Sequence, residues 1–155
     1  MATRIPSLLG EECRERWKSR HPFERQWEWR ALNEAIRRHM AVEEEVFYPA
    51  FLDATEDSLA HFLASVGHEK IAAEMQDALE LSASSANFVS RVRAIKKVFL
   101  HHVSDMEEEG GMFDRARRST MQHELLARLL RARYAALEAA AGKGEYHPRR
   151  TAHYR

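Results

Sequence analysis

The feature that most constrains the fold of this chain is a helical period in its apolar residues. Side chains repeating every three or four positions share one helix face, and that face must be buried. The period runs through four segments, 23–52, 56–81, 87–108 and 115–140. A shorter segment near 7–20 is also predicted to be helical. Because short connections join long amphipathic helices, we predict an all-α fold: an up-and-down antiparallel four-helix bundle with a short N-terminal helical segment.

Prolines and glycines are few and lie at the edges of these segments, where Pro22 suits a first helical turn and the pair at 110–111 interrupts the period. A chain of 155 residues suits one domain with a sizeable core. We therefore predict a single bundle domain over residues 1–141. The closing stretch "GKGEYHPRRTAHYR" has a flexible, basic composition, so residues 142–155 are predicted to be a tail.

Composition excludes several classes of function. The 24 Lys and Arg residues balance 24 Asp and Glu residues, which gives no argument for a nucleic-acid partner or a membrane surface. No apolar run approaches the ~20 residues that span a bilayer, and the N-terminus lacks the apolar core of a signal peptide. Cys13 is the single cysteine and has no disulfide partner within the chain. We expect a cytoplasmic protein with neither nucleic-acid nor membrane partners, and the composition does not predict its oligomeric state.

Three histidines lie on apolar stripes that are predicted to be buried. His39, His68 and His102 each come from a different helix, and Glu43 shares the stripe of His39. One histidine on an apolar face is usually a satisfied core residue. Three imidazoles and a carboxylate together are costly to desolvate without partners. A metal ion would supply the partner for all four, and imidazole with carboxylate suits iron, manganese or zinc.

The spacing distinguishes two classes of di-metal bundle. Ferritin-like bundles use Glu-x-x-His, and none of the nine histidines here has a glutamate three residues earlier. The order is reversed in "HMAVEEEVFYPAF", followed by "GHEKI" and "FLHHVSDMEEEGGMFDRAR". These three blocks resemble the haemerythrin-like HHE cation-binding domain. The resemblance implies a four-helix bundle around a non-haem, usually di-iron, centre with carboxylate bridges. It also implies binding or sensing of dioxygen, nitric oxide or peroxide.

The resemblance carries over to individual residues. His39 and Glu43 match the family's first pair, with Glu43 as the expected bridge, while Glu44 and Glu45 should point to solvent or support a histidine. His68 matches the lone histidine and His102 the histidine of the last pair. The carboxylate of that last pair is ambiguous among residues 105–109. We favour Glu107, which would need a π-bulge to reach the site.

One ligand of the family pattern is missing. The family draws a further histidine from its first helix, but His21 is the only histidine before His39 and would lie ~27 Å away along a helix. His123 is a conceivable substitute, with a surface role the simpler interpretation. Two hypotheses follow. The leading one is a non-haem iron protein, with two ions expected, whose enzymatic status the sequence leaves open. The alternative is a degenerate, metal-free bundle that acts as an interaction or sensor module.

Overall fold

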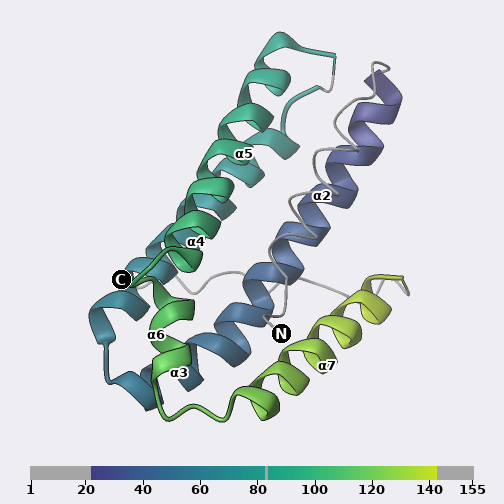
Figure 1. Ribbon diagram of the computed structural model, residues 1–155. Coiled ribbons are helices and arrows are strands. Elements are labelled where there is room, and N and C mark those ends of the chain that lie inside the picture. The colour runs from purple at the N-terminus through teal and green to yellow at the C-terminus, as the bar shows by residue number, and fades with distance from the viewer. Residues whose placement is uncertain (1–21, 83, 143–155) are drawn as a thin grey trace, which may run out of the picture.

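In the computed structural model, residues 22–82 and 84–142 form an all-α bundle, and these ranges contain no strand. The predicted helix near 7–20 lies outside the described residues, as does the tail beyond its first residue, Gly142. Figure 1 shows the helices packed along one another. The elements are α2 (Pro22–Val42), a π-helical turn η1 (Glu43–Phe47), α3 (Tyr48–Thr55), α4 (Ser58–Leu79), α5 (Ala86–Glu107), α6 (Met112–Arg118) and α7 (His123–Gly142).

The first predicted helix is continuous from α2 through η1 to α3, and it contains a π turn that was not predicted there. Pro49 explains the turn, because proline has no N–H and its ring displaces the carbonyl of the residue four positions earlier. The N–H of Tyr48 instead donates to the carbonyl of Glu43, five residues back. The added residue per turn changes which side chains share the buried face after Glu43.

Side-chain caps start the next two helices, within two residues of the predicted starts at 56 and 87. The Asp57 carboxylate accepts from the N–H of Ala60 at 2.8 Å and starts α4. The Ser85 hydroxyl accepts from the N–H of Phe88 at 3.0 Å and starts α5. These caps satisfy backbone donors that the first helical turn leaves free.

Two consecutive glycines end the third predicted helix. Gly110 adopts a φ of 78°, a left-handed conformation that L side chains rarely take. At Gly111 an added Cβ would lie 2.5 Å from the carbonyl oxygen of Asp105, so no side chain fits there. The chain therefore leaves α5 abruptly after Glu107 and re-enters a helix at Met112.

The fourth predicted helix, 115–140, is wrong as a single element, because it is divided into α6 and α7. Ser119 makes the break: its hydroxyl donates to the carbonyl of Ala116 at 2.7 Å and accepts from the N–H of Met121 at 3.2 Å. Such local side-chain bonds compete with the helical ladder. Met121, which follows the turn, is buried.

The core consists of two apolar clusters. The larger cluster joins α2, α4 and α5 through buried residues, among them Ile36, Ile71, Phe88 and Phe99. The smaller cluster joins η1, α3, α4 and α6 through residues such as Phe47, Phe51 and Met112. Along this helix, His39 and Glu43 flank Met40 of the larger cluster and precede Phe47 of the smaller one, so they lie where the two clusters meet.

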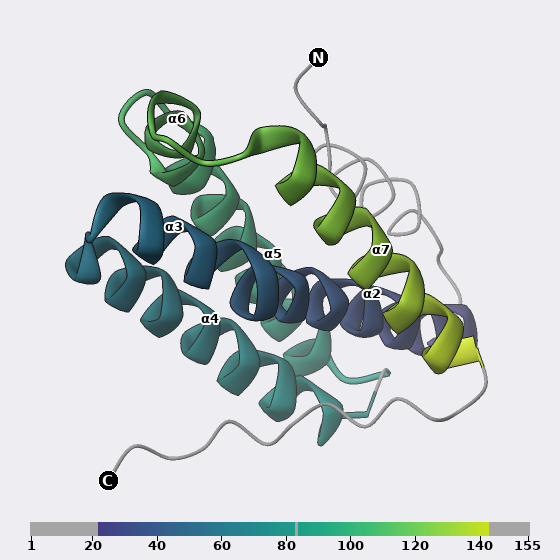
Figure 2. The same ribbon diagram turned by 90° about the horizontal axis from the view of Figure 1, so that it is seen from below.

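Helix α7 packs against α2 and η1 (Figure 2). The Arg133 guanidinium donates to the Glu45 carboxylate at 2.6 Å, and the Arg38 guanidinium lies over the Tyr134 ring at 5.8 Å. These contacts hold the π turn from its outer side. No helix in the described ranges combines the length and apolar character that crossing a membrane requires.

Candidate metal centre

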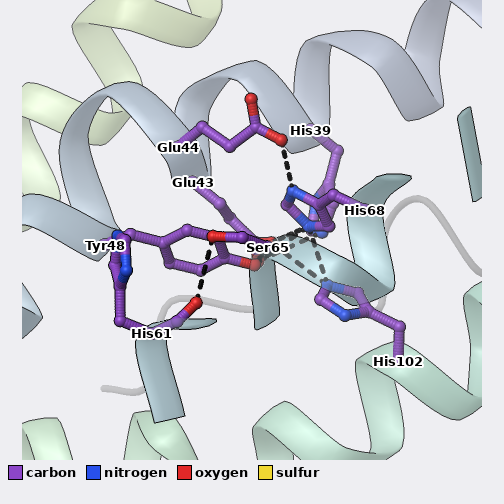
Figure 3. A network of polar contacts seen from close by, with 8 residues as sticks. All are labelled: His39, Glu43, Glu44, Tyr48, His61, Ser65, His68 and His102. Atoms are coloured by element: carbon purple, nitrogen blue, oxygen red, sulfur yellow. Dashed lines mark hydrogen bonds and ion pairs between the residues drawn. The ribbon is translucent and has the colours of Figure 1, made fainter. Parts of the chain in front are cut away.

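Four of the predicted site residues meet in the bundle interior. His39 comes from α2, Glu43 from η1, His68 from α4 and His102 from α5, and each is at most 8% exposed. Figure 3 shows the three imidazoles directed at the Glu43 carboxylate. The helical period placed each residue on a buried stripe, and the packing of three helices brings those stripes to one level.

The contact distances place three ring nitrogens around one carboxylate. Glu43 Oε2 lies 3.0 Å from His68 Nε2 and 3.2 Å from His102 Nε2, while Glu43 Oε1 lies 3.2 Å from His39 Nε2. The Nε2 atoms of His68 and His102 are 3.1 Å apart. The donor atoms of His39, Glu43 and His102 all lie within 4.8 Å of one another. Because a shared ion sits about 2.0–2.2 Å from each ligand, ligand atoms at such separations are compatible with one ion.

The hydrogen-bond inventory also fits a cation. His39 Nε2 is buried, and although Glu43 Oε1 is near, the two atoms are not aligned for a hydrogen bond, so this nitrogen has no hydrogen-bond partner. A buried ring nitrogen without a partner costs stability. A metal ion can be coordinated by imidazole nitrogen and by carboxylate oxygen at the same time. The residues present therefore fit a metal ion.

The pKa values of Glu43 and His68 are set by two opposing effects, burial and contacts with neighbouring charged groups. Burial alone would raise the pKa of Glu43, but the charge of His39 and the contacts with the three imidazoles hold that pKa well below its ordinary value. Burial would lower the pKa of His68, yet its hydrogen bonds with Glu43 and Glu44 raise it. The metal-free protein therefore favours the protonated form of His68, whose two ring nitrogens face Glu43 and Glu44.

Glu44 supports His68 from the other side of its ring. The Glu44 carboxylate lies 2.8 Å from His68 Nδ1, and the two are drawn in Figure 3. A carboxylate at one ring nitrogen fixes the tautomer and directs the other nitrogen toward a metal. This matches one of the two expectations for Glu44. Glu45 instead points outward to Arg133.

Tyr48 is a site residue that the sequence analysis missed. Its ring is buried, and its hydroxyl lies 3.2 Å from Glu43 Oε2 and 3.0 Å from His68 Nε2. Burial and the neighbouring carboxylate of Glu43 raise the pKa of Tyr48, so the phenol stays protonated. In a regular α-helix, side chains five positions apart diverge, and only the π turn places Tyr48 beside Glu43. Pro49 was the available signal for that turn.

Glu107 is not brought to the cluster. Helix α5 remains α-helical to its end, without the π-bulge that this residue would need, and Met106 takes the inward position one turn after His102. Glu107 is exposed, as are the alternative carboxylates Asp105 and Glu109. Asp105 instead lies 3.2 Å from His101 on the helix surface.

Of the two candidates for the missing histidine, only His123 lies in the described ranges. His123, the conceivable substitute, is exposed at the start of α7. His21 lies outside the described residues. Within the described ranges, the group of residues suited to a metal therefore has a single carboxylate, Glu43.

Comparison with known proteins adds no relative. No family model matches the chain, and no curated protein and no solved structure matches it either. The chemistry of the site is therefore argued from its own residues.

Proposed function

We propose that this chain is a non-haem iron protein of the haemerythrin-like class, in which an up-and-down bundle encloses the iron. His39, Glu43, His68 and His102 would hold the metal. The observation that supports this most directly is the convergence of three buried Nε2 atoms on one buried carboxylate. Burying this set without a cation costs free energy, because each polar group leaves water.

Iron bound there would supply redox chemistry and an open position for a small ligand such as dioxygen, peroxide or nitric oxide. The chain's own residues would do the rest. Glu44 orients His68, Tyr48 offers a buried hydroxyl beside Glu43, and the rings of Phe99 and His39 pack at 5.4 Å to keep water from that flank.

The number of carboxylate ligands in the site limits how many iron ions it can hold. A second iron needs carboxylate bridges. In the described part of the chain, Glu43 is the one carboxylate in the group that could share an ion, because Glu44 contacts the other nitrogen of His68. We propose one firmly held iron. The second ion of the family pattern stays a prediction. Water, or a residue of the N-terminal segment such as Glu11, Glu12 or Glu15, would fill the position that the missing histidine leaves open.

The alternative is a metal-free bundle that acts as an interaction or sensor module. One observation favours it: His68, Glu43, Glu44 and Tyr48 already pair with one another at hydrogen-bond distances of 2.8–3.2 Å. Such a network partly satisfies the buried groups without an ion. It leaves His39 Nε2 without a hydrogen-bond partner, which is why we prefer the metal.

The test is the metal content and absorption spectrum of protein purified without chelator. We expect iron in the native protein and its loss in His39→Ala and His68→Ala, with His101→Ala as the matched control on an exposed histidine. A metal-free protein that also fails to take up ferrous iron anaerobically would exclude the iron proposal in favour of the interaction module.

A further inference from the structure

The first half of α4 is apolar on two opposite faces. Ala64 and His68 face inward and are buried. On the other side, Leu59, Phe62 and Leu63 are 65%, 60% and 59% exposed. A helix that is apolar on both sides is normally covered on both sides.

These three exposed side chains, together with the half-buried Val66, form a continuous stripe. Leu59, Phe62, Leu63 and Val66 follow the spacing of one helix face. Three large apolar residues within five positions, each about 60% exposed, form a patch of the kind that marks an interaction site.

The chain's own ends join the described part far from this stripe. Figure 2 shows α4 beginning beside α3 and α6, whereas α2 begins and α7 ends at the opposite end of the bundle. The stripe therefore lies toward the end of the bundle away from the start of α2 and the end of α7.

Charges at the two ends of the stripe point to which molecule. Lys70 is exposed one turn after Val66, and Glu56 is exposed just before the Asp57 cap. No ion pair of either residue occurs within the described ranges. A helix with a cation beyond one end of an apolar stripe and a carboxylate beyond the other is complementary to an antiparallel copy of itself.

We propose that two copies of this chain associate through α4, with a two-fold axis passing near Phe62 and Leu63. Antiparallel pairing about that axis sets Phe62 against Phe62 of the second copy and Leu59 against Val66. It also brings Lys70 of each copy toward Glu56 of the other, so both apolar residues and charges are matched in an isologous contact. This inference does not depend on the metal site, which lies on the other face of α4.

Sedimentation of the full chain across micromolar concentrations tests the contact. We expect a monomer–dimer equilibrium for the native chain. Phe62→Glu should raise the dimer Kd by about 30-fold or more, as the loss of a central apolar contact does. Leu129→Glu, at a residue 49% exposed on α7, is the matched control and should leave the Kd unchanged.

Exchanging the charges of Lys70 and Glu56 gives a second test, which does not depend on whether the Phe62→Glu variant folds. Lys70→Glu and Glu56→Lys should each raise the Kd by about five- to tenfold, because each sets like charges together at both ends. The double variant should return the Kd toward the native value. A native chain that stays monomeric, a dimer that survives Phe62→Glu with the fold intact, or a double variant no tighter than the singles would overturn the proposal.

Discussion

Two neighbouring layers of the bundle interior are equally dry but chemically opposite. In the larger apolar cluster, Ile71, Phe88 and Ile95 are at most 1% exposed and contribute only hydrocarbon. In the adjacent layer, His39, Glu43 and His68 are 2–5% exposed and contribute nitrogen and oxygen. Burial stabilises the first layer and costs free energy in the second. The difference teaches that packing alone does not account for the polar layer.

The largest expected effect concerns the apolar layer. Phe88→Ala removes a ring that packs edge-on against Trp29 at 6.2 Å. We expect the free energy of unfolding to fall by about 3–5 kcal/mol, measured by urea denaturation. The metal stoichiometry of the folded fraction should not change, because Phe88 lies in the first turn of α5 and His102 lies near the other end of that helix. Loss of metal in that fraction would show that the two layers are not separable.

Replacing the polar layer by apolar side chains should have the opposite effect: the free energy of unfolding should not fall, but metal binding should be lost. In Glu43→Leu/His68→Leu/Tyr48→Phe, which removes the Tyr48 hydroxyl together with its two partners, the metal-free protein should be as stable as the native one or up to about 4 kcal/mol more stable, since apolar replacements of buried ionic groups often are. Metal binding should disappear. Urea denaturation of both apo-proteins measures the change. A loss of several kcal/mol would instead assign the layer a purely structural function.

The two glutamates after Glu43 have different roles: Glu44 contacts the metal-site residue His68, and Glu45 contacts Arg133 on the surface. Glu44→Gln should weaken ferrous-iron binding by about 10–100-fold, because the partner that orients His68 is changed. Glu45→Gln alters only the contact with Arg133, and its metal affinity should stay near native. Anaerobic titration of each apo-protein gives the affinities. An equal loss of iron affinity in the two variants would mean that the inward and outward positions of Glu44 and Glu45 around the π turn are wrongly assigned.

The smallest effect is on pH dependence. The lowered pKa of Glu43 gives stability that is present above about 4.5 and lost as pH falls below it. The raised pKa of His68 gives stability that is present below about 6.5 and lost as pH rises through the folded value. The metal-free protein should therefore be most stable between these values and less stable at pH 8.

Iron affinity should change in the other direction over the same range, because the metal replaces the proton on His68. His68→Gln should flatten the upper part of the apo-stability profile, as measured by denaturation at pH 5.5 and pH 8. An apo-protein that gains stability from pH 5.5 to pH 8 would contradict the assigned charge on His68.

The predictable part of the site was the part set by helical period. His39, His68 and His102 lie on regular apolar stripes, so their burial follows from phase. Tyr48 was missed because the π turn at Pro49 shifts the phase by one residue. Glu107 was expected inward on a bulge, yet α5 keeps its α-helical phase and Met106 fills the inward position. The helical period can be read from the sequence. Where the backbone becomes irregular depends on packing between helices, which the sequence pattern does not reveal.

The same contrast holds for the fold. The first three long helices follow from their apolar periods, and their ends lie near the expected breaks. The break between α6 and α7 does not, because Ser119 and buried Met121 interrupt a period that otherwise continues.

The most direct test of the central claim is an anaerobic titration of the apo-protein with ferrous iron that follows stoichiometry and melting temperature together. A ligand that binds only the folded state adds RT ln(1 + [L]/Kd) to stability, about 2.7 kcal/mol at 100 times Kd. We predict one firmly bound iron per chain, with a rise in melting temperature that Glu43→Ala abolishes. A melting temperature that iron leaves unchanged, in native protein and Glu43→Ala alike, would contradict the account.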